Sequence, residues 1–343
     1  MERSLLRHPA SYDESLTLRE IEIPVHSKDE MLVKVIGSSL CSSDRLLFDP
    51  DFFLTKSLES PVTMGHEATS RVMKVGENVV NFCIGDPVGF LASRGCFECV
   101  QCRTYSSYGC PKGLEAQGFT CNGYLQEYIV VDARSAAKFP PSLDVARSAP
   151  LCCAGVTAYN AIKECLPEAG KWLAVFGTGG VGKMAIKYAK AKGFKVVAVD
   201  IDKDQLGDAE RAGADETFMP SDLSPDRVAI IREKTRGGVD AAVNFTSSSQ
   251  SYTDMQGLIK FNGILTVVGI ADELKLKPMD ISFRKLVIKG APNGTAQDLK
   301  ECFEFSAKHD IKAPHKFIEL QDVPQVVEEM NSGTVRERMI VLF

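Results

Sequence analysis

The second half of the chain alternates strand-like and helical segments, and this alternation limits the fold more than any other feature. The strand-like runs lie at 171–177, 195–202, 240–245, 263–270 and 286–290. The helical patterns between them lie at 182–193, 204–214 and 250–261. Short strands that alternate with helices of about 10–15 residues predict βαβ units and a parallel sheet. We therefore expect an α/β fold with a doubly wound parallel sheet over residues 151–293.

A glycine-rich turn joins the first of these strands to the first helix. It comprises Gly177, Gly179, Gly180, Val181 and Gly182. In a G-x-G-x-x-G turn, the first glycine allows the tight bend, the second admits a pyrophosphate, and the third lets helix and strand pack closely. Asp200 ends the next strand, 18 residues after Gly182. An acid at this position binds ribose hydroxyls and repels a 2′-phosphate, which favours NAD over NADP.

The chain before and after these alternating segments has a different residue pattern. Runs rich in β-branched residues lie at 31–37, 69–76 and 125–131. The tail has helical patterns at 296–309 and 323–333 and a final strand at 339–343. We expect the tail to return to the β-rich first part, which gives two domains. Residues 1–150 and 294–343 would form one, and residues 151–293 the other.

Four cysteines in the first part have the spacing of a metal site. Cys96, Cys99, Cys102 and Cys110 follow the pattern C-x2-C-x2-C-x7-C. Two residues between ligands let a tight turn direct two thiolates at one ion, and four thiolates complete the tetrahedral shell of zinc. A complete shell leaves no position for substrate, so we expect a structural zinc. An iron–sulfur cluster uses similar spacings, and four ordinary buried thiols are the plainest alternative.

Composition and charge argue against several classes of function. The 343 residues carry a net charge of -5 with no long run of Lys or Arg, which argues against nucleic-acid binding. No stretch reaches the roughly 18 apolar residues of a membrane span. The N-terminal segment carries Asp13 and Glu14 and lacks the apolar core of a signal peptide. Clustered cysteines among the eleven in the chain point to metal binding in a reducing compartment, so we expect a cytoplasmic protein.

Three separated segments supply ligands for a second metal ion. They offer Cys41, His66, and either Cys152 or Cys153. Catalytic zinc takes three protein ligands and keeps an open position. Taken alone, a cysteine such as Cys41 is more often a buried thiol, and His66 could equally be a loop histidine with ordinary hydrogen bonds.

With these segments in place, the sequence resembles the zinc-containing medium-chain alcohol dehydrogenases along almost its whole length. The matching segments are C-x-x-D at 41–44, G-H-E at 65–67, G-D-x-V at 85–88, the four-cysteine lobe, CAGVTAY at 153–159 and GTGGVG at 177–182. The yeast and bacterial branch is the most similar. The resemblance implies a GroES-like catalytic domain, a Rossmann domain and zinc-dependent transfer of a hydride between NAD(H) and a small-molecule alcohol or the matching aldehyde or ketone. It also implies two zinc ions per chain and a homo-oligomer, with a tetramer favoured over a dimer.

The resemblance further implies roles for single residues. The cysteine directly before Ala-Gly is the ligand, so the catalytic zinc would be bound by Cys41, His66 and Cys153, with Glu67 as a transient ligand. Zinc acts as a Lewis acid on the hydroxyl group, Ser43 takes the proton of the alcohol, and Asp44 orients His66. The residues implied to contact the cofactor, beyond the glycine turn and Asp200, are Thr157, Val268, Gly269, Ile270 and Arg338.

Two departures from the family pattern concern the backbone and the cofactor. Ser70 stands where the family has a glycine, and we expect it to change a local turn. Ala296 stands where an arginine usually lies near the cofactor phosphates, which predicts weaker cofactor binding.

Two further departures concern catalysis and the substrate. Leu46 replaces the histidine that often completes the proton relay, which predicts slower proton transfer near neutral pH. Leu91 and Ala92 replace aromatic residues of the substrate wall, although Phe52 or Phe53 could take their place. These smaller side chains predict a preference for alcohols or aldehydes bulkier than ethanol.

Two alternative interpretations of the sequence keep the same fold but assign a different function. One is a biosynthetic reductase of a bulky aldehyde, ketone or activated double bond. The other is a zinc-stabilised dinucleotide-binding protein without catalysis, which the retention of three ligands and Ser43 argues against. The cysteines outside both metal sites are expected to be buried thiols: Cys83, Cys121, Cys152, Cys165 and Cys302.

Overall fold

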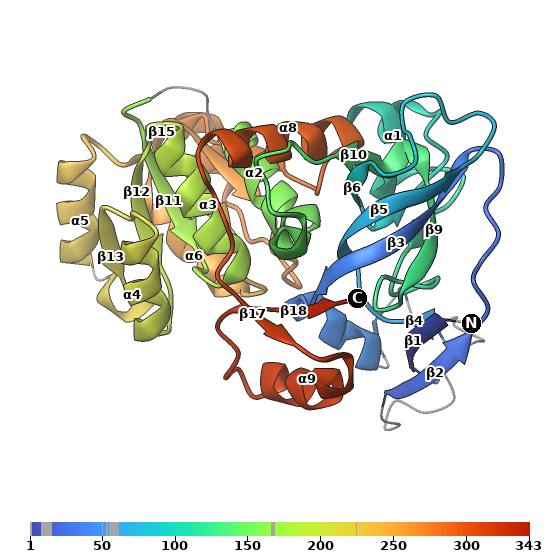
Figure 1. Cartoon of the computed structure of the whole chain (residues 1–343). Helices are drawn as coiled ribbons and strands as arrows, with labels where there is room; N and C mark the ends of the chain where they lie inside the picture. Colours follow the sequence, from blue (N-terminus) through green and yellow to red (C-terminus); the bar gives the residue numbers. More distant parts are fainter. Residues whose placement is uncertain are drawn as a thin grey trace. The chain divides into compact units, whose positions relative to one another are not determined.

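The computed structural model describes residues 2–7, 16–49, 51–52, 54, 62–165, 169–223 and 225–343. The chain divides into two compact units (Figure 1). Met1–Val156 and Asn293–Phe343 form the first unit, and Thr157–Pro292 forms the second. Among the described residues, no helix has the length and apolar character that crossing a membrane requires.

The second unit is built on a six-stranded parallel sheet. Its strands are β11 (Trp172–Phe176), β12 (Lys195–Val199), β13 (Glu216–Phe218), β14 (Val239–Asn244), β15 (Ile259–Val267) and β16 (Val287–Gly290). They lie in the order β13-β12-β11-β14-β15-β16, all parallel. This is the doubly wound order, with its switch point between β11 and β14. The predicted α/β class and parallel sheet are therefore confirmed.

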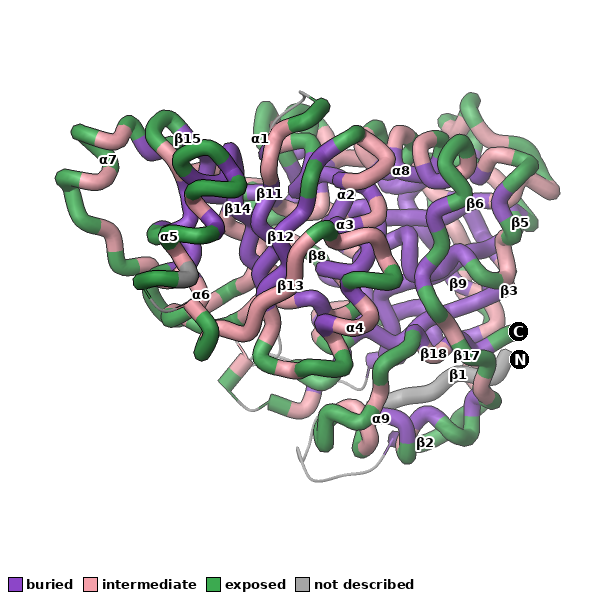
Figure 2. Tube along the Cα trace, turned by 90° about the vertical axis from the view of Figure 1, so that its left-hand side faces the viewer, coloured by how far each residue is buried: buried purple, intermediate pink, exposed green. Residues whose placement is uncertain are grey.

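Helices connect these strands. They are α2 (Ala154–Cys165), which begins in the first unit, α3 (Gly180–Ala191), α4 (Lys203–Arg211), α5 (Pro225–Lys234), α6 (Ser249–Leu258) and α7 (Pro278–Arg284). Strands β11, β12 and β14 are buried along almost their whole length (Figure 2), as expected when helices cover both faces. The helix predicted over 250–261 is too long, because Ile259 already pairs with Val239 at the start of β15.

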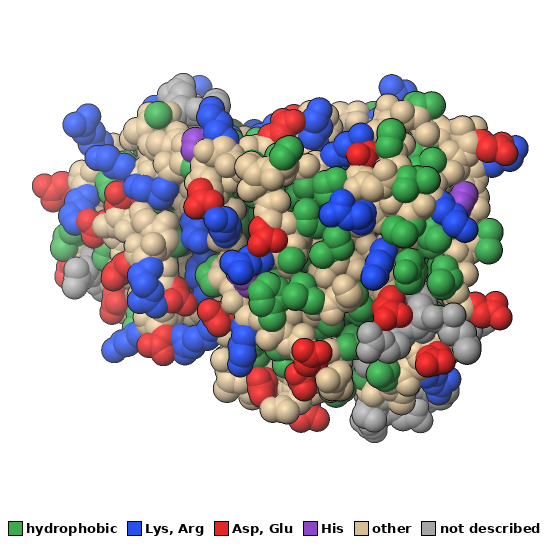
Figure 3. Space-filling model, in the orientation of Figure 1, with side chains coloured by type: hydrophobic (Ala, Val, Ile, Leu, Met, Phe, Trp, Pro, Cys, Tyr) green, Lys and Arg blue, Asp and Glu red, His purple; other side chains and the backbone are tan. Residues whose placement is uncertain are grey.

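Charged side chains of both signs mix on the surface of this unit. Figure 3 shows Lys and Arg interspersed with Asp and Glu over the region of α4 and α5. Lys190 pairs with Asp215 at 2.6 Å, and the half-exposed Lys234 pairs with Glu216. Alternating signs of this kind produce no extended field of one sign on that face.

The first unit contains a seven-stranded sheet. Its strands are β3 (Glu30–Ser39), β5 (Glu67–Val75), β6 (Pro87–Phe90), β9 (Tyr128–Asp132), β10 (Ala136–Lys138), β17 (His315–Ile318) and β18 (Arg338–Leu342). The path runs β10-β6-β5-β3-β18-β17, and β9 also pairs with β3. Because β18 pairs antiparallel with β3, the C-terminal tail is part of the same sheet as the N-terminal half.

Smaller elements complete the first unit. The strands are β1 (Glu2–Arg7), β2 (Thr17–Ile21), β4 (Val62–Thr63), β7 (Ser93–Arg94) and β8 (Glu115–Ala116). The helices are α1 (Val100–Thr104), α8 (Ala296–Lys308) and α9 (Val323–Asn331), and the 3-10 turns η1 (Ser42–Phe48), η2 (Ser107–Gly109) and η5 (Ala149–Cys152) lie near the site. Thr295 caps α8 through a reciprocal pair of bonds with Asp298, so the segment that includes Ala296 starts a helix.

The structure corrects two expectations about side chains. Cys83 is exposed and Cys121 is half-buried, so only Cys152, Cys165 and Cys302 are buried thiols outside the predicted metal sites. Ser70 was expected in a turn, but it lies inside β5, where it pairs with Val35 of β3.

Ser70 also leads to a stability prediction. Its hydroxyl is fully buried and has no hydrogen-bond partner among the described residues. Since an unpaired buried hydroxyl costs free energy, Ser70→Ala is expected to raise the free energy of unfolding by about 1 kcal/mol. Chemical denaturation measures this change. The matched control is Ser135→Ala, which removes a buried hydroxyl that donates to the Asp132 carbonyl at 2.8 Å and should lower stability by a similar amount. A loss of stability in both variants would contradict the prediction.

Candidate active site

The four residues predicted to bind the catalytic zinc meet in the first unit. The ligand atoms of Cys41, His66, Glu67 and Cys153 all lie within 4.8 Å of one another. The sheet explains this convergence, because β3 and β5 pair with Ser39 opposite Glu67, so the chain just after β3 lies beside the chain just before β5. Cys153 directly follows η5, which contacts both strands. The neighbouring Cys152 instead points to the Ala68 carbonyl at 3.1 Å.

Asp44 orients two of these ligands. Its Oδ1 lies 2.7 Å from Nδ1 of His66, and its Oδ2 accepts a hydrogen bond of 2.7 Å from the backbone N–H of Cys41. A proton on Nδ1 leaves the lone pair of Nε2 for a metal. The Ser43 hydroxyl lies 3.0 Å from that Nε2. The carboxylate therefore fixes both the imidazole and the backbone from which the first thiolate projects.

One thiol of the cluster favours its ionised form before any metal binds. A hydrogen bond from Cys153 holds the pKa of Cys41 well below its usual value and raises the pKa of Cys153 well above it. Burial lowers the pKa of His66, but Asp44 and Cys41 together outweigh burial and leave that pKa well above its usual value. Burial raises the pKa of Glu67 to about 8. A cluster that already favours one thiolate is a good acceptor for a divalent ion.

The donor set fits zinc. Two donors on one zinc ion, each at about 2.0–2.3 Å, lie at most about 4.6 Å apart, and every pair of donor atoms here lies within 4.8 Å. Two sulfurs and one imidazole form the Cys₂His set of a catalytic site that keeps one position open. Zinc bound there would supply a Lewis acid for a substrate hydroxyl or carbonyl group.

The second metal cluster lies in the lobe around α1. The sulfurs of Cys96, Cys99, Cys102 and Cys110 also lie within 4.8 Å of one another. Backbone N–H groups of this lobe point at its sulfurs, for example from Cys99 to Cys96 and from Cys102 to Cys99, each at 3.4 Å. Such bonds from Cys99 and Glu98 lower the pKa of Cys96 to about 6. Four thiols without another ligand type form a closed, structural site.

The glycine turn of the second unit has the geometry that a dinucleotide needs. Gly177 has φ +82°, and a Cβ there would lie 2.6 Å from the Thr246 side chain. A Cβ on Gly182 would lie 1.9 Å from the Gly177 carbonyl oxygen. By contrast, a Cβ on Gly179 would meet no atom within 4 Å. Gly179, with this open space beside it, directly precedes α3. The backbone N–H groups in the first turn of that helix can bind a pyrophosphate.

Asp200 lies where the next strand ends, and its carboxylate is held in place. Thr178 donates to Oδ2 from its backbone N–H at 2.6 Å and from its hydroxyl at 3.0 Å. The Asp202 N–H donates to Oδ1 at 3.0 Å. An oriented carboxylate at this strand end can accept bonds from ribose hydroxyls.

The comparisons with known proteins identify the family of the chain. A family model for the GroES-like domain of alcohol dehydrogenases matches residues 27–141, and one for zinc-binding dehydrogenases matches residues 180–308. An alcohol dehydrogenase of Geobacillus stearothermophilus is 32% identical over 332 residues, which cover 96% of this chain and 96% of that protein. The chain belongs to the zinc-containing medium-chain alcohol dehydrogenase family.

Solved structures of this family share the fold. The alcohol dehydrogenase of the archaeon Aeropyrum pernix has a TM-score of 0.85 at 26% identity, over 99% of this chain and 100% of that chain. A cinnamyl alcohol dehydrogenase of Sorghum bicolor has a TM-score of 0.85 at 25% identity, over 99% of this chain and 97% of that chain.

Arg338 lies at the metal cluster of this dehydrogenase. Its guanidinium is buried, 3.3 Å from the Glu67 carboxylate, and it donates to the Leu40 carbonyl at 3.2 Å. The cationic side chain therefore favours the ionised form of Glu67 and partly offsets the rise in its pKa caused by burial. The sequence assigned it to the cofactor pyrophosphate, and the contacts that the structure gives it are within the first unit.

The predicted nicotinamide contacts lie in the second unit. Thr157 is half-buried near the start of α2, and Val268, Gly269 and Ile270 follow β15. The Gly269 N–H donates to the Asn244 carbonyl at 2.8 Å, and a Cβ there would lie 2.0 Å from the Thr246 carbonyl oxygen. Only glycine lets the chain pass so close to the end of β14.

The aromatic neighbour of His66 is Phe119, which the sequence analysis missed. The centroids of the two rings lie 5.2 Å apart, and the ring of Phe52 lies edge-on to that of Phe119 at 5.8 Å. Phe119 is buried, although nothing in its local sequence distinguishes it from an ordinary core residue. Of the two phenylalanines proposed for the wall, Phe52 lies in this stack, and Phe53 lies outside the described residues.

The other predicted wall residues belong to the region around β6. Leu91 is buried, and Ala92 is half-buried against the core of the seven-stranded sheet. The Gln117 N–H donates to the Ala92 carbonyl at 2.9 Å, which ties this segment to the loop that carries Phe119. Leu46, at the position of the missing relay histidine, is partly exposed on η1.

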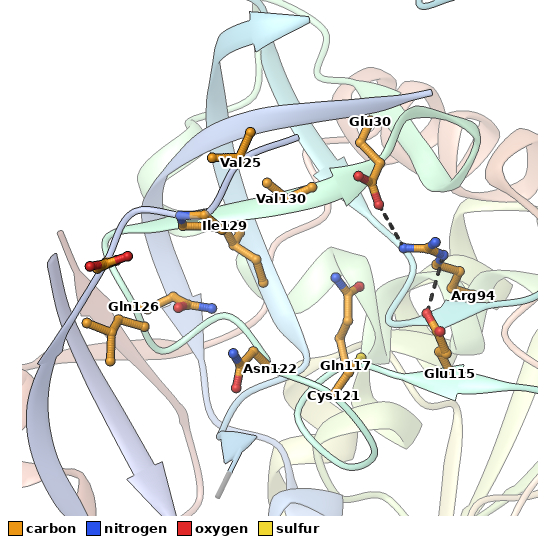
Figure 4. Close-up of a pocket in the computed structure, with 13 residues that line it drawn as sticks. Val25, Glu30, Arg94, Glu115, Gln117, Cys121, Asn122, Gln126, Ile129 and Val130 are labelled. Atoms are coloured by element: carbon orange, nitrogen blue, oxygen red, sulfur yellow. Dashed lines mark hydrogen bonds and ion pairs between the residues drawn. The ribbon is translucent and has the colours of Figure 1, made fainter. Parts of the chain in front are cut away.

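A separate pocket of about 360 Å³ lies in the first unit (Figure 4). Arg94 crosses one side of it and binds Glu30 at 3.0 Å and Glu115 at 3.3 Å. The carboxamides of Gln117 and Gln126 and the apolar side chain of Ile129 line the rest. None of the eight predicted metal ligands lines this pocket.

Proposed function

We propose that this dehydrogenase transfers a hydride between NAD(H) and alcohols or carbonyl compounds bulkier than ethanol. The observation that carries the proposal is the convergence of Cys41, His66 and Cys153, with Asp44 fixing the imidazole. Ser43 lies beside this cluster and would take the proton of the substrate hydroxyl. The glycine turn and Asp200 would hold NAD. The related Sorghum protein, by its name, acts on cinnamyl alcohol, which is consistent with a bulky substrate.

The proposed activity is tested on the purified chain loaded with zinc. NADH formation is measured with ethanol, benzyl alcohol and a branched secondary alcohol, and NADH consumption with the matching carbonyls and a conjugated enone. We expect larger kcat/KM values for the bulky alcohols and carbonyls than for ethanol. Turnover of the enone alone would favour the reductase of an activated double bond, and no turnover at all would favour the non-catalytic protein.

Substrate size is expected to depend on Ala92. The change Ala92→Trp fills the wall, so the ratio of kcat/KM for ethanol to that for benzyl alcohol should rise about tenfold or more. The control is Ala133→Trp, because Ala133 packs against the same core outside the proposed wall. If the ratio of the two kcat/KM values does not change in Ala92→Trp, Ala92 is not part of the substrate wall.

The missing relay histidine leads to a pH prediction. Leu46 supplies no imidazole at the relay position, so a histidine there, with its usual pKa of roughly 6.5, does not assist proton release. The pH profile of kcat for the parent enzyme should therefore lack an inflection in that range. Leu46→His should introduce one, with the rate rising as pH rises through it, because the neutral imidazole accepts the proton. A parent profile that already inflects near 6.5 would contradict this reading.

We also propose that the chain assembles as a homotetramer in the cytoplasm. Strand β16 is an edge of its sheet, and nearby side chains of α7, including Met279 and Phe283, are exposed and apolar. Such a surface favours self-association. All eleven cysteines are free thiols in the structure, which suits a reducing compartment. Sedimentation velocity gives the mass, and a monomer would contradict the assembly, while cell fractionation tests the location.

A further inference from the structure

Both carboxylate oxygens of Glu67 are already bound by protein groups. The Ser39 hydroxyl donates to Oε2, and the Arg338 guanidinium lies 3.3 Å from Oε1. The backbone N–H of Ala154 also donates to Oε1, at 3.4 Å. Ser39 and Glu67 are both fully buried, where a hydrogen bond to a carboxylate is strong.

The pairing of β3 with β5 places Ser39 beside the Glu67 carboxylate. Ser39 ends β3 directly opposite Glu67, the first residue of β5. The neighbouring Ser38 donates to the backbone carbonyl of Glu67 at 3.1 Å. Two consecutive serines therefore hold the same residue, but only Ser39 binds its carboxylate.

We propose that Ser39 is a positioning residue that competes with the metal for Glu67 and keeps one coordination position open for substrate. A carboxylate oxygen of Glu67 lies within 4.8 Å of the donor atoms of Cys41, His66 and Cys153. Without the bond from Ser39, a change of side-chain rotamer would bring that oxygen into the shell as a fourth ligand. Four protein ligands make a closed site, whereas a catalytic site keeps a free position. This inference rests on the proposed function, because it requires a metal at these donors.

The test uses the enzyme loaded with cobalt(II) and measures imidazole binding through the visible spectrum, which changes when the metal gains a ligand. Ser39→Ala should weaken imidazole binding by about tenfold or more, because Glu67 then occupies the position that imidazole needs. Ser39→Gly removes the same hydroxyl and should agree with it. Ser39→Thr keeps a hydroxyl and should keep the parental affinity. The matched control Ser38→Ala removes a neighbouring buried hydroxyl and should also leave the affinity unchanged.

A double-mutant cycle separates positioning from a general structural effect. In Glu67→Gln, the neutral amide is a poor metal ligand, so adding Ser39→Ala should cause no further change in imidazole affinity. Unchanged affinity in Ser39→Ala, or equal weakening in both backgrounds, would overturn the proposal. A parent with two cobalt ions that does not bind imidazole would overturn it too. A parent that binds only one metal ion would instead overturn the proposed function itself.

Discussion

Replacing Cys153 by alanine is expected to lower kcat/KM by roughly three orders of magnitude or more, because the catalytic ion loses a direct ligand. The zinc content should fall from about two ions per chain to about one, since the four-cysteine lobe is untouched. Metal analysis and kinetics on the same preparation measure both effects. Retention of the lobe's zinc shows that the variant still folds.

The neighbouring cysteine provides the matched control. Cys152 is fully buried and donates to the Ala68 carbonyl, away from the metal cluster. Cys152→Ala should therefore keep both zinc ions and most of the activity, with a small loss of stability from the smaller side chain. If Cys152→Ala lost the second zinc and Cys153→Ala kept it, the assignment of the ligand would be reversed.

Two glycine variants should separate the stability of the second unit from cofactor binding. Gly182→Ala places a methyl group 1.9 Å from the Gly177 carbonyl oxygen, so the turn must move. We expect a loss of about 3 kcal/mol in unfolding free energy. Gly179→Ala meets no protein atom within 4 Å and should leave stability unchanged. Its methyl group would instead occupy the space proposed for the pyrophosphate, so NADH should bind roughly 100-fold more weakly, about 2.8 kcal/mol.

A third glycine variant serves as the control for both the stability and the NADH-binding measurements. Gly207 lies within α4, where a Cβ would come no closer than 3.7 Å to another atom. Gly207→Ala should raise stability by about 0.5–1 kcal/mol and leave NADH binding unchanged. Thermal unfolding and NADH fluorescence titration measure the whole set. Equal NADH affinity in Gly179→Ala and the parent would place the pyrophosphate elsewhere.

The cofactor fold could be predicted because its signals are local. Buried runs of five or six residues form β11, β12 and β14 at the centre of the second unit, and the glycine turn needs only the residues between β11 and α3. The prediction failed at residue 259, where the apolar periodicity suits both a helix end and a strand. Pairing with β14 decides the conformation there, and that pairing is not visible in a local pattern.

The two metal sites also differ in how far their ligands could be predicted from local sequence. The four-cysteine cluster could be found from spacing alone, because its ligands lie within one lobe of the chain. The second cluster required a resemblance to a family, since its donors come from three segments that only the pairing of β3 with β5 brings together. Phe119, Ser39 and the buried position of Arg338 had no local signal at all.

The sequence by itself determined the doubly wound unit with its glycine turn and the four-thiol site. These depend on short-range geometry, namely the period of apolar residues, the conformations open to glycine, and the reach of two cysteines across a turn. Only the tertiary structure decided how Glu67 is held, which aromatic ring lies against His66, and that Ser70 is a buried strand residue. The positions of Glu67 and Ser70 depend on strand register, because shifting β5 by one residue would turn both side chains to the opposite face. Phe119 lies in a loop, and it reaches His66 only through the tertiary path of that loop.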